Sequence, residues 1–292
     1  MIKDVGYLEI LKTNPGTSVQ DQGRIGLAKW GIPISGVMDR RSYHWINHLL
    51  KNDPDAAVLE IPQPGFKCRF DSYATIGLAG AIATIRKNGE LVPSTILRIL
   101  PGDELEVGKF LAGSIVYLGI SQGFQTEKVL TSRSLYSGIT LAKMLAKGEK
   151  IPFFTTQSFG EATFSSAKKN IKWIENRALE VYPGPDFGEL PKEIQDRLMN
   201  SEFTISTLAN RMAFQLEELL PNSISERLTA PVYPGTIQLT AAGKIIILMR
   251  DAQVTGGYPR ILQVAEDPLS LLAQKKVGQQ IKFQLKNLTH IE

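Results

Sequence analysis

Short apolar runs separated by turn-forming residues dominate this chain and predict β-strands. Clear examples cover residues 7–12, 57–61 and 114–120, each bounded by residues that favour turns. Asn88 and Gly89 lie between two further runs, and this dipeptide is a strong signal for a two-residue hairpin. Many short strands of this kind predict closed or nearly closed β-barrels.

Helical patterns are confined to a few short segments. Asp39 is a candidate N-cap for a helix that continues to about Lys51. Pro191 suits the first position of a second helix, and Asp267-Pro268 opens a third, because proline is tolerated in the first helical turn. Few helices among many strands predict a mostly β chain.

Length and composition allow two domains of ordinary size. The chain has 292 residues, with 43% hydrophobic and 21% charged residues, as expected of a globular protein with ample core material. Residues 97–107 and 271–283 share a loose pattern of an apolar run, a turn and an alternating segment, which favours two related β-rich domains. We predict an N-terminal domain at 1–170, including a connecting segment, and a C-terminal domain at 171–292.

Charge and cysteine content exclude several classes of partner. The net charge is +4 and basic residues are spread along the chain, so no nucleic-acid-binding stripe is predicted. No apolar window approaches a membrane span, and the first residues lack the apolar run of a signal peptide. Cys68 is the only cysteine, which rules out an internal disulfide and favours a reducing compartment. The expected location is therefore the cytoplasm, with no membrane partner.

The sequence does not match the motifs of a zinc protease or a serine hydrolase. His44 and His48 have the spacing of a helical metal pair, but the residues between them lack the glutamate of a zinc-protease motif, so no metal site is predicted. Ser35 does not lie in a nucleophile elbow, and no histidine is a compelling base for it. Cys68 alternates with Phe66 and Phe70, which predicts a small core residue on their face of a strand.

What remains is a set of polar and charged side chains without an obvious nucleophile. Arg24 can clamp a carboxylate, carbamoyl or phosphate oxygen, or it can pair with Asp21 and brace the loop. Glu60 ends an apolar strand and can be a general base, or it can be paired with an arginine. Arg211 is expected to be partly buried and then needs an acidic partner such as Asp251 or Glu60.

The segment 250–260 concentrates polar groups between two apolar strand candidates, 245–249 and 261–264. Its Gly256-Gly257 pair allows backbone dihedrals closed to other residues and a close approach of a ligand, although a plain turn is the alternative. Around a small amide or carboxylate, the segment can place a carboxylate, an amide, a hydroxyl, the glycine amides and the flat ring of a tyrosine.

Motifs in a shared order along the chain carry a family resemblance. Residues 19–24, 31–39 and 250–260 together resemble the allophanate hydrolase subunit 2 family, also called the Kip-inhibitor antagonist, 5-oxoprolinase C-subunit or biotin-dependent carboxyltransferase-like family. Further matching segments extend the resemblance nearly from end to end: 57–60, 130–133, 181–185, 210–212 and 235–238.

The resemblance implies a fold and a function. The family's fold is two cyclophilin-like β-barrel domains. The resemblance implies that this chain is a subunit of an ATP-dependent 5-oxoprolinase-like amidohydrolase complex that acts on a small cyclic or linear amide. The implied partner is a subunit-1-type, Kip-inhibitor-like protein. ATP would be used by the complex, because this chain has no familiar phosphate-binding loop. The alternatives are a urea- or allophanate-type carboxyltransferase subunit, which needs biotin on another chain, and a non-enzymatic antagonist of a Kip-type kinase inhibitor.

The candidate site residues are expected to meet around one substrate between the two barrels, where arginines and backbone N–H groups polarise an amide carbonyl. The candidate catalytic residues are Arg24, Glu60, Arg133, Arg211 and Asp251. The candidate substrate-binding residues are Gln20, Asp21, Ser35, Asp39, Ser132, Asn210, Gln238, Thr255, Gly256, Gly257 and Tyr258.

Several motif positions depart from the family pattern. The lost acidic side chains and hydroxyls raise the question of whether the usual substrate is used, and they favour the antagonist alternative. The substitutions are Ala79 for Thr, Ile82 for Asp, Gln122 for Gly, Leu135 for Thr, Asn210 for Asp and Val254 for Thr.

Overall fold

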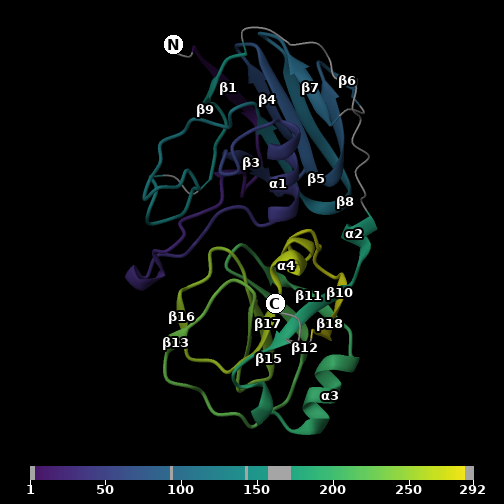
Figure 1. Cartoon of the computed structure of the whole chain (residues 1–292). Coiled ribbons are helices and arrows are strands. Elements are labelled where there is room, and N and C mark those ends of the chain that lie inside the picture. The colour runs from purple at the N-terminus through teal and green to yellow at the C-terminus, as the bar shows by residue number, and fades with distance from the viewer. Residues whose placement is uncertain (1–3, 93–94, 142–143, 157–171, 287–292) are drawn as a thin grey trace. The chain divides into compact units, whose positions relative to one another are not determined.

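The structure, a computed structural model, describes residues 4–92, 95–141, 144–156 and 172–286. Contacts group the chain into two compact units (Figure 1): residues 1–24 with 35–171, and residues 25–34 with 172–292. The predicted boundary between residues 170 and 171 lies outside the described residues and stays a prediction.

The first unit is built on a nine-stranded sheet of the order β2-β3-β8-β4-β1-β9, with β5 joined to β6, β7 and β8. The predicted strands at 7–12, 57–61 and 114–120 are confirmed, although the last is only the final part of a strand that begins at Glu104. The strands are β1 (Val5–Lys12), β2 (Ser18–Gln20), β3 (Val58–Ile61), β4 (Phe66–Phe70), β5 (Ala74–Lys87), β6 (Glu90–Leu91), β7 (Ile96–Ile99), β8 (Glu104–Ile120) and β9 (Lys150–Phe154).

The predicted hairpin at Asn88-Gly89 is also confirmed. It joins β5 to β6, and both residues adopt positive φ angles of 52° and 85°. This is the geometry in which an Asn-Gly pair matches the right-handed twist of the two strands.

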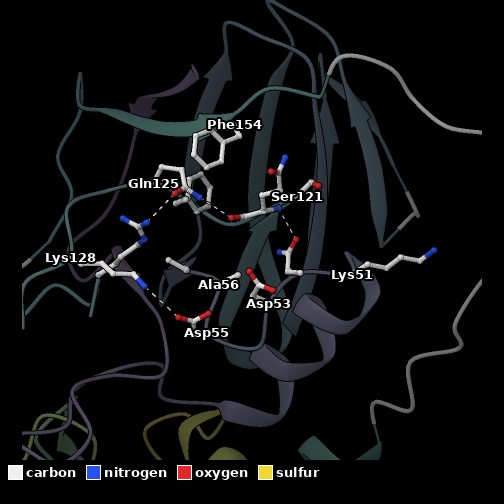
Figure 2. A pocket seen from close by; sticks show the side chains of 13 residues that line it. Lys51, Asp53, Asp55, Ala56, Ser121, Gln125, Lys128 and Phe154 are labelled. Atoms are coloured by element: carbon white, nitrogen blue, oxygen red, sulfur yellow. Dashed lines mark hydrogen bonds and ion pairs between the residues drawn. The ribbon is translucent and has the colours of Figure 1, made fainter. Parts of the chain in front are cut away.

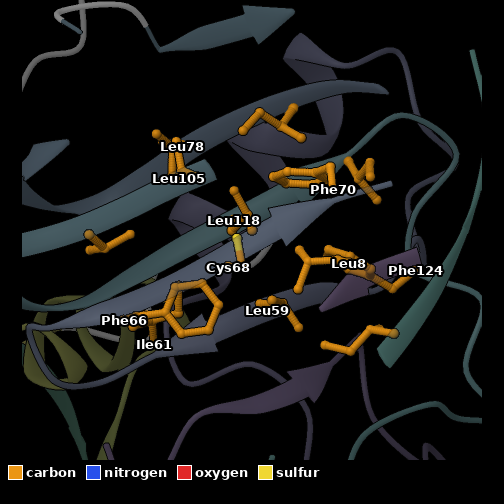
Figure 3. Close-up of a cluster of buried hydrophobic side chains, with 14 of the residues drawn as sticks. Leu8, Leu59, Ile61, Phe66, Cys68, Phe70, Leu78, Leu105, Leu118 and Phe124 are labelled. Atoms are coloured by element: carbon orange, nitrogen blue, oxygen red, sulfur yellow. The ribbon is translucent and has the colours of Figure 1, made fainter. Parts of the chain in front are cut away.

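One face of this sheet carries the hydrophobic core (Figure 3). Val19, Leu59, Leu118 and Leu78 lie in register across β2, β3, β8 and β5, and all four belong to the buried cluster. Cys68 is fully buried in the same cluster, as its alternation on β4 predicts. Burial raises the pKa of its thiol, so Cys68 is a packing residue.

The opposite face carries a polar row beneath a helix. Ser18, Glu60 and Tyr117 lie in register across β2, β3 and β8 and are buried. Helix α1 (Arg40–Leu49) packs on this face, and its Ile46 fits against the paired glycines Gly77 and Gly119. A Cβ added at Gly77 would lie 2.3 Å from Cδ1 of Ile46, so the glycines set how closely the helix approaches the sheet.

The second unit is a closed barrel of the order β10-β17-β14-β15-β12-β11-β18, in which β10 and β18 pair in parallel. Alternate residues are buried, such as Ile245 and Ile247 on β15. Its strands are β10 (Ala178–Pro183), β11 (Phe203–Ala209), β12 (Ala213–Leu219), β14 (Thr236–Leu239), β15 (Lys244–Leu248), β17 (Arg260–Val264) and β18 (Gln280–Leu285), with a separate ribbon of β13 (Ala230–Pro231) and β16 (Thr255–Gly256).

The helices follow the sequence signals closely. Asp39 caps α1 by accepting a hydrogen bond from the backbone N–H of Ser42 at 2.9 Å, as predicted. Pro191 is the N-cap of α3 and not its first helical residue, and α4 begins just before Asp267-Pro268. The remaining helical segments are α2 (Lys172–Glu175), α3 (Lys192–Asn200), α4 (Glu266–Ala273) and the 3-10 turns η1 (Ala28–Trp30) and η2 (Phe187–Glu189).

The prediction of a mostly β chain with barrel-type architecture and few helices is confirmed. In the described part of the chain, no helix combines the length and the apolar character that crossing a membrane requires.

We expect Gly184→Ala to destabilise the protein by about 1–3 kcal/mol, because the added methyl group overpacks the join between β10 and β17. A Cβ at Gly184 would lie 2.2 Å from the backbone oxygen of Arg260, which cannot rotate away. Gly188→Ala is the matched control, since a Cβ there meets no atom within 4 Å. Urea unfolding followed by circular dichroism measures both, and equal midpoints for the two variants would contradict the packing argument.

Candidate functional site

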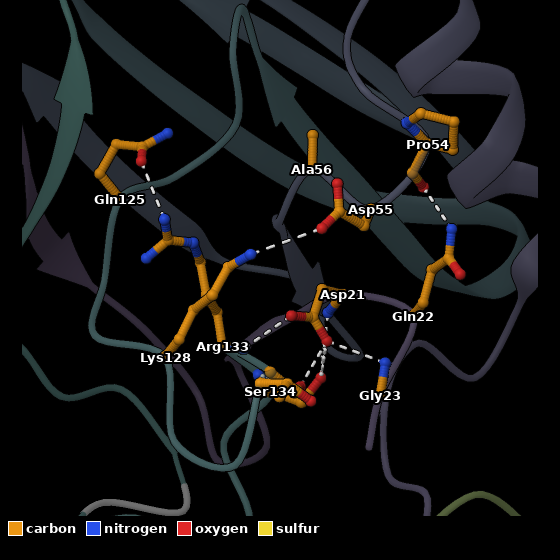
Figure 4. Close-up of polar contacts among 12 residues, drawn as sticks. Asp21, Gln22, Gly23, Pro54, Asp55, Ala56, Gln125, Lys128, Arg133 and Ser134 are labelled. Carbon is orange, nitrogen blue, oxygen red and sulfur yellow. Dashed lines mark hydrogen bonds and ion pairs between the residues drawn. The ribbon is translucent and has the colours of Figure 1, made fainter. Parts of the chain in front are cut away.

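The carboxylate of Asp21 is the centre of a buried hydrogen-bond network in the first unit (Figure 4). Asp21 directly follows β2 and is 4% exposed. Its Oδ1 accepts from Ser132 Oγ at 2.6 Å, Ser134 Oγ at 2.7 Å and the N–H of Gly23 at 2.8 Å. Its Oδ2 accepts from the N–H of Arg133 at 2.6 Å. One carboxylate therefore fixes three consecutive residues of a distant loop.

Arg24 holds the same loop through its backbone carbonyls. Its Nη2 donates to the carbonyl of Ser134 at 2.6 Å and its Nε to the carbonyl of Val129 at 3.2 Å, and the residue is 0% exposed. Of the two roles considered for Arg24, this geometry favours the loop brace over the ligand clamp. A direct catalytic role for Arg24 stays a prediction.

Glu60 belongs to the polar row under α1. Its Oε2 accepts from the N–H of Met38 at 2.8 Å and from the hydroxyl of Tyr117 at 2.8 Å. The Tyr117 oxygen in turn accepts from the N–H of Asp39 at 2.8 Å. Burial, reinforced by the carboxylates of Glu60 and Asp39, raises the pKa of Tyr117 well above its usual value, so the phenol remains a donor. Glu60 thus positions the start of α1, and its role as a base stays a prediction.

Ser35 and Gln20 carry buried polar atoms that find no hydrogen-bond partner among the described residues. These atoms are Oγ of Ser35 and Oε1 of Gln20. Ser35 also has a positive φ of 56°, which is uncommon for a residue with a side chain. The Nε2 of Gln20 donates to Ser18 Oγ at 3.0 Å and to the carbonyl of Leu135 at 3.3 Å. Unfilled hydrogen-bonding capacity therefore exists beside the Asp21 network.

A cavity of about 360 Å³ adjoins Arg133 in the first unit (Figure 2). We call it the Arg133 pocket. Phe124 and Phe154 supply its aromatic surface, and most of the other side chains are polar or charged. It is lined by Lys51, Asn52, Asp53, Asp55, Ala56, Ala57, Ser121, Gln122, Phe124, Gln125, Lys128, Arg133 and Phe154.

Arg133 is fixed at both ends. Asp21 holds its backbone, and its Nη2 donates to Oε1 of Gln125 at 2.9 Å. The Nε2 of Gln125 donates to the carbonyls of Gln122 at 2.8 Å and Gly123 at 3.0 Å, so the amide cannot turn away. Desolvation lowers the pKa of the Arg133 guanidinium from its usual value, although Asp21 and Asp55 oppose that effect.

In the second unit, Arg211 pairs with Asp251, one of the two acidic partners that the sequence analysis named. Its Nε and Nη2 donate to the two carboxylate oxygens of Asp251 at 2.8 and 2.9 Å, and the N–H of Asp251 donates to the carbonyl of Arg211 at 2.8 Å. Next to them, Oδ1 of Asn210 accepts from the N–H groups of Met212 at 2.7 Å and Ala213 at 3.2 Å. The pair and the turn together hold the β11–β12 hairpin against the segment after β15.

For the glycine pair after this segment, the structure gives a packing role to Gly256, and the close approach of a ligand stays a prediction. Neither Gly256 nor Gly257 has a positive φ, so the pair is not needed for a left-handed turn. Instead, a Cβ at Gly256 would lie 2.6 Å from Nε2 of the buried Gln238, an atom without a hydrogen-bond partner in the described structure. Thr255 and Gly256 form β16, and Tyr258 is 39% exposed beside them.

The candidate residues therefore fall into two groups, each within one unit, and their catalytic and binding roles stay predictions. The first unit brings together Gln20, Asp21, Arg24, Ser35, Asp39, Glu60, Ser132 and Arg133. The second contains Asn210, Arg211, Gln238, Asp251, Thr255, Gly256, Gly257 and Tyr258.

Some of the polar residues found in the structure are missing from the sequence prediction. Ser134 could have been found, because it repeats Ser132 two positions later, whereas Gln125 lies in no motif. Asp186 follows directly after the 181–185 motif and accepts from the N–H of Arg260 at 2.7 Å and from Nε of Arg227 at 3.2 Å.

We expect Asp21→Asn to destabilise the protein by about 1–3 kcal/mol and to loosen residues 132–134, because an amide leaves at least one buried N–H or hydroxyl without an acceptor. Asp53→Asn is the matched control, since the Asp53 side chain is exposed and has no hydrogen bond to the described residues. Urea unfolding and amide hydrogen exchange measure the two effects. Unchanged exchange at residues 132–134 in Asp21→Asn would show that the carboxylate does not hold the loop.

Comparison with known proteins places these residues in a family. Residues 30–285 match the family described as carboxyltransferase domain, subdomain A and B. The chain is 29% identical over 283 residues to the C-subunit of 5-oxoprolinase from Escherichia coli (strain K12), a match that covers 94% of this chain and 90% of that protein. It is 31% identical over 303 residues to urea amidolyase of Saccharomyces cerevisiae, a match that covers 94% of this chain but 16% of that protein.

A solved structure shows the same fold. The crystal structure of the K. lactis urea amidolyase matches with a TM-score of 0.82 and 24% identity, over 95% of this chain and 18% of that one. The family match over residues 30–285, with the shared fold, shows that the chain belongs to the carboxyltransferase domain family, subdomains A and B, and confirms the resemblance found in its motifs.

Proposed function

We propose that this chain is a subunit of an ATP-dependent 5-oxoprolinase-like amidohydrolase complex that acts on a small cyclic or linear amide. The observation that carries the proposal is the end-to-end similarity to the C-subunit of 5-oxoprolinase, which leaves little of either chain unmatched. That relative is named as one subunit of an enzyme, which supports a multi-chain assembly here, with a subunit-1-type protein as the expected partner.

The chemistry of the described residues fits such a role. Hydrolysis of an amide requires groups that polarise its carbonyl and stabilise the negative charge that develops on the oxygen. A guanidinium group and backbone N–H groups can do this without a covalent nucleophile. Arg24 is committed to two carbonyls and Arg211 to Asp251, whereas Arg133 faces a cavity. Of these candidate arginines, Arg133 has the geometry best suited to a substrate.

ATP is assigned to the complex and not to a motif of this chain. The sequence has no Gly-rich phosphate-binding loop of a familiar kind. The residues of this chain would orient the amide, and a partner would supply the nucleotide site.

A second candidate is a carboxyltransferase subunit of the urea type. The name of the matched family and the similarity to urea amidolyase favour it. This alternative requires biotin on a carrier that another chain supplies. The third candidate, an antagonist of a Kip-type kinase inhibitor, predicts binding to a partner protein without turnover.

We expect the purified chain, combined with its subunit-1-type partner and the other members of the complex, to release glutamate from 5-oxoproline only when ATP is present. Omitting this chain should abolish the release. Transfer of a carboxyl group from biotinylated carrier to urea, without glutamate release, would favour the carboxyltransferase. A stable complex with no turnover of either substrate would favour the antagonist.

We expect Arg211→Ala to suppress glutamate release by that complex, because Asp251 then remains partly buried without its cation and the loop after β15 loses its anchor. The unfolding midpoint of the variant must be measured alongside, since the same change also lowers stability. Normal turnover in a folded Arg211→Ala complex would remove Arg211 from the mechanism.

A further inference from the structure

We propose that the Arg133 pocket is a binding site for small organic monocarboxylates, in which the guanidinium of Arg133 takes the carboxylate. The inference rests on the proposed function in one respect: the carboxylate would then belong to the amide substrate. Arg133, its fixed orientation, the charge of the lining and the size of the cavity carry the argument.

Arg133 is a half-buried cation that makes no ion pair with the described residues. Its guanidinium has one hydrogen bond among them, to the neutral amide of Gln125. Three arginines of the second unit, by contrast, have carboxylate partners: Arg211 has Asp251, Arg227 has Asp186 and Glu189, and Arg250 has Glu266. A cation withdrawn from water is stabilised by an anion, so a ligand carboxylate would complete the environment of Arg133.

Two amide side chains in the wall of the pocket, Asn52 and Gln125, are held in place by hydrogen bonds. Asn52 Nδ2 donates to Oδ1 of Asn47 at 3.0 Å and to the carbonyl of Ile120 at 2.8 Å, and its Oδ1 accepts from the N–H of Gln122 at 2.7 Å. Both polar ends of the Gln125 amide are engaged as well. These amides hold the site in shape, and Arg133 retains donors to offer a ligand, in a fork that suits a carboxylate.

The charges of the lining residues favour a ligand with one negative charge over a ligand with two. Among the residues that line the pocket, the cations Lys51, Lys128 and Arg133 outnumber the carboxylates Asp53 and Asp55 by one, and Nζ of Lys128 lies 3.5 Å from Oδ2 of Asp55. A dianion such as phosphate would face the two carboxylates without enough compensating charge.

Size and apolar surface favour a small organic molecule. The cavity of about 360 Å³ is at the lower end of the range for small-molecule sites. Phe124 and Phe154 can pack against the CH₂ groups of a compact ligand while Arg133 binds its carboxylate.

The backbone around the pocket is held in uncommon conformations. Lys51 and Gln122 have positive φ angles of 54° and 67°, and both line the cavity. The family resemblance implies glycine at position 122. Gln122 therefore places a side chain at the pocket at the cost of backbone strain from its positive φ angle. Backbone strain of this kind persists where the surrounding structure fixes it and is concentrated at binding sites.

Isothermal titration calorimetry on the full chain tests the proposal with 5-oxoproline, 2-pyrrolidinone and inorganic phosphate as probes. We expect 5-oxoproline to bind saturably. The lactam 2-pyrrolidinone, which lacks the carboxylate, should bind at least about tenfold more weakly, the loss expected for a hydrogen-bonded charge. Phosphate should not displace 5-oxoproline.

Substitutions of Arg133 test whether 5-oxoproline binds in the Arg133 pocket. Arg133→Gln should weaken 5-oxoproline binding at least about tenfold, and Arg133→Lys should retain part of the affinity, because it keeps the charge but loses the fork. Arg69→Gln is the matched control: Arg69 is exposed on β4, paired with Glu104, and should leave binding unchanged. If Arg133→Gln fails to fold, Arg133→Lys and the lactam comparison still decide the question.

Failure of this inference differs from failure of the proposed function. No binding of 5-oxoproline, equal binding of 2-pyrrolidinone, displacement by phosphate or full affinity in a folded Arg133→Gln variant would overturn the carboxylate site. An unchanged KM for 5-oxoproline in an active Arg133→Gln complex would overturn it too, while the complex remains an amidohydrolase. Binding that depends on Arg133, in a complex without turnover, would instead support the site and overturn the proposed function.

Discussion

The candidate site of the first unit depends on one buried carboxylate, that of Asp21. Ser132, Arg133 and Ser134 come from a loop more than a hundred positions away, and all three donate to this side chain. Hydrogen bonds to an ionised acceptor are stronger than those between neutral groups, so a short run of chain after β2 can anchor an irregular loop. Arg24 completes the anchor by binding the loop's carbonyls. The position of the Arg133 guanidinium follows from this anchoring.

The two faces of the sheet in the first unit have different roles: one stabilises the fold, and the other positions helix α1. One face is an apolar layer, and the other carries Glu60 and Tyr117 beneath α1. Their hydrogen bonds reach the N–H groups of Met38 and Asp39 at the start of that helix. Since Gly77 and Gly119 let α1 lie close, the helix can seal this polar row from water, and Lys51, which follows the C-cap of α1, borders the Arg133 pocket.

Local signals could be predicted from the sequence, and non-local pairing could not. The Asp39 cap and the Asn88-Gly89 hairpin are decided within a few residues, so pattern and propensity were sufficient. The parallel pairing of β10 with β18, which closes the barrel, joins residues about a hundred positions apart and has no local signature. In the candidate site, the pair of Arg211 and Asp251 is an exception among the non-local contacts. Arg211 could be assigned an acidic partner because a partly buried cation requires one. The hydrogen bonds between Asp21 and residues 132–134 depend on the path of a long loop, so the sequence predicted Asp21, Ser132 and Arg133 as site residues but neither Ser134 nor the contacts among them.

The sealed thiol of Cys68 has a practical consequence. Thiol reagents attack the thiolate, and a fully buried group with a raised pKa offers them neither access nor the reactive form. Because the chain has no other cysteine, its folded surface is chemically silent toward maleimides and similar labels. A cysteine placed at any exposed position would therefore be a unique attachment point for a spectroscopic probe, with no need to remove the native residue first.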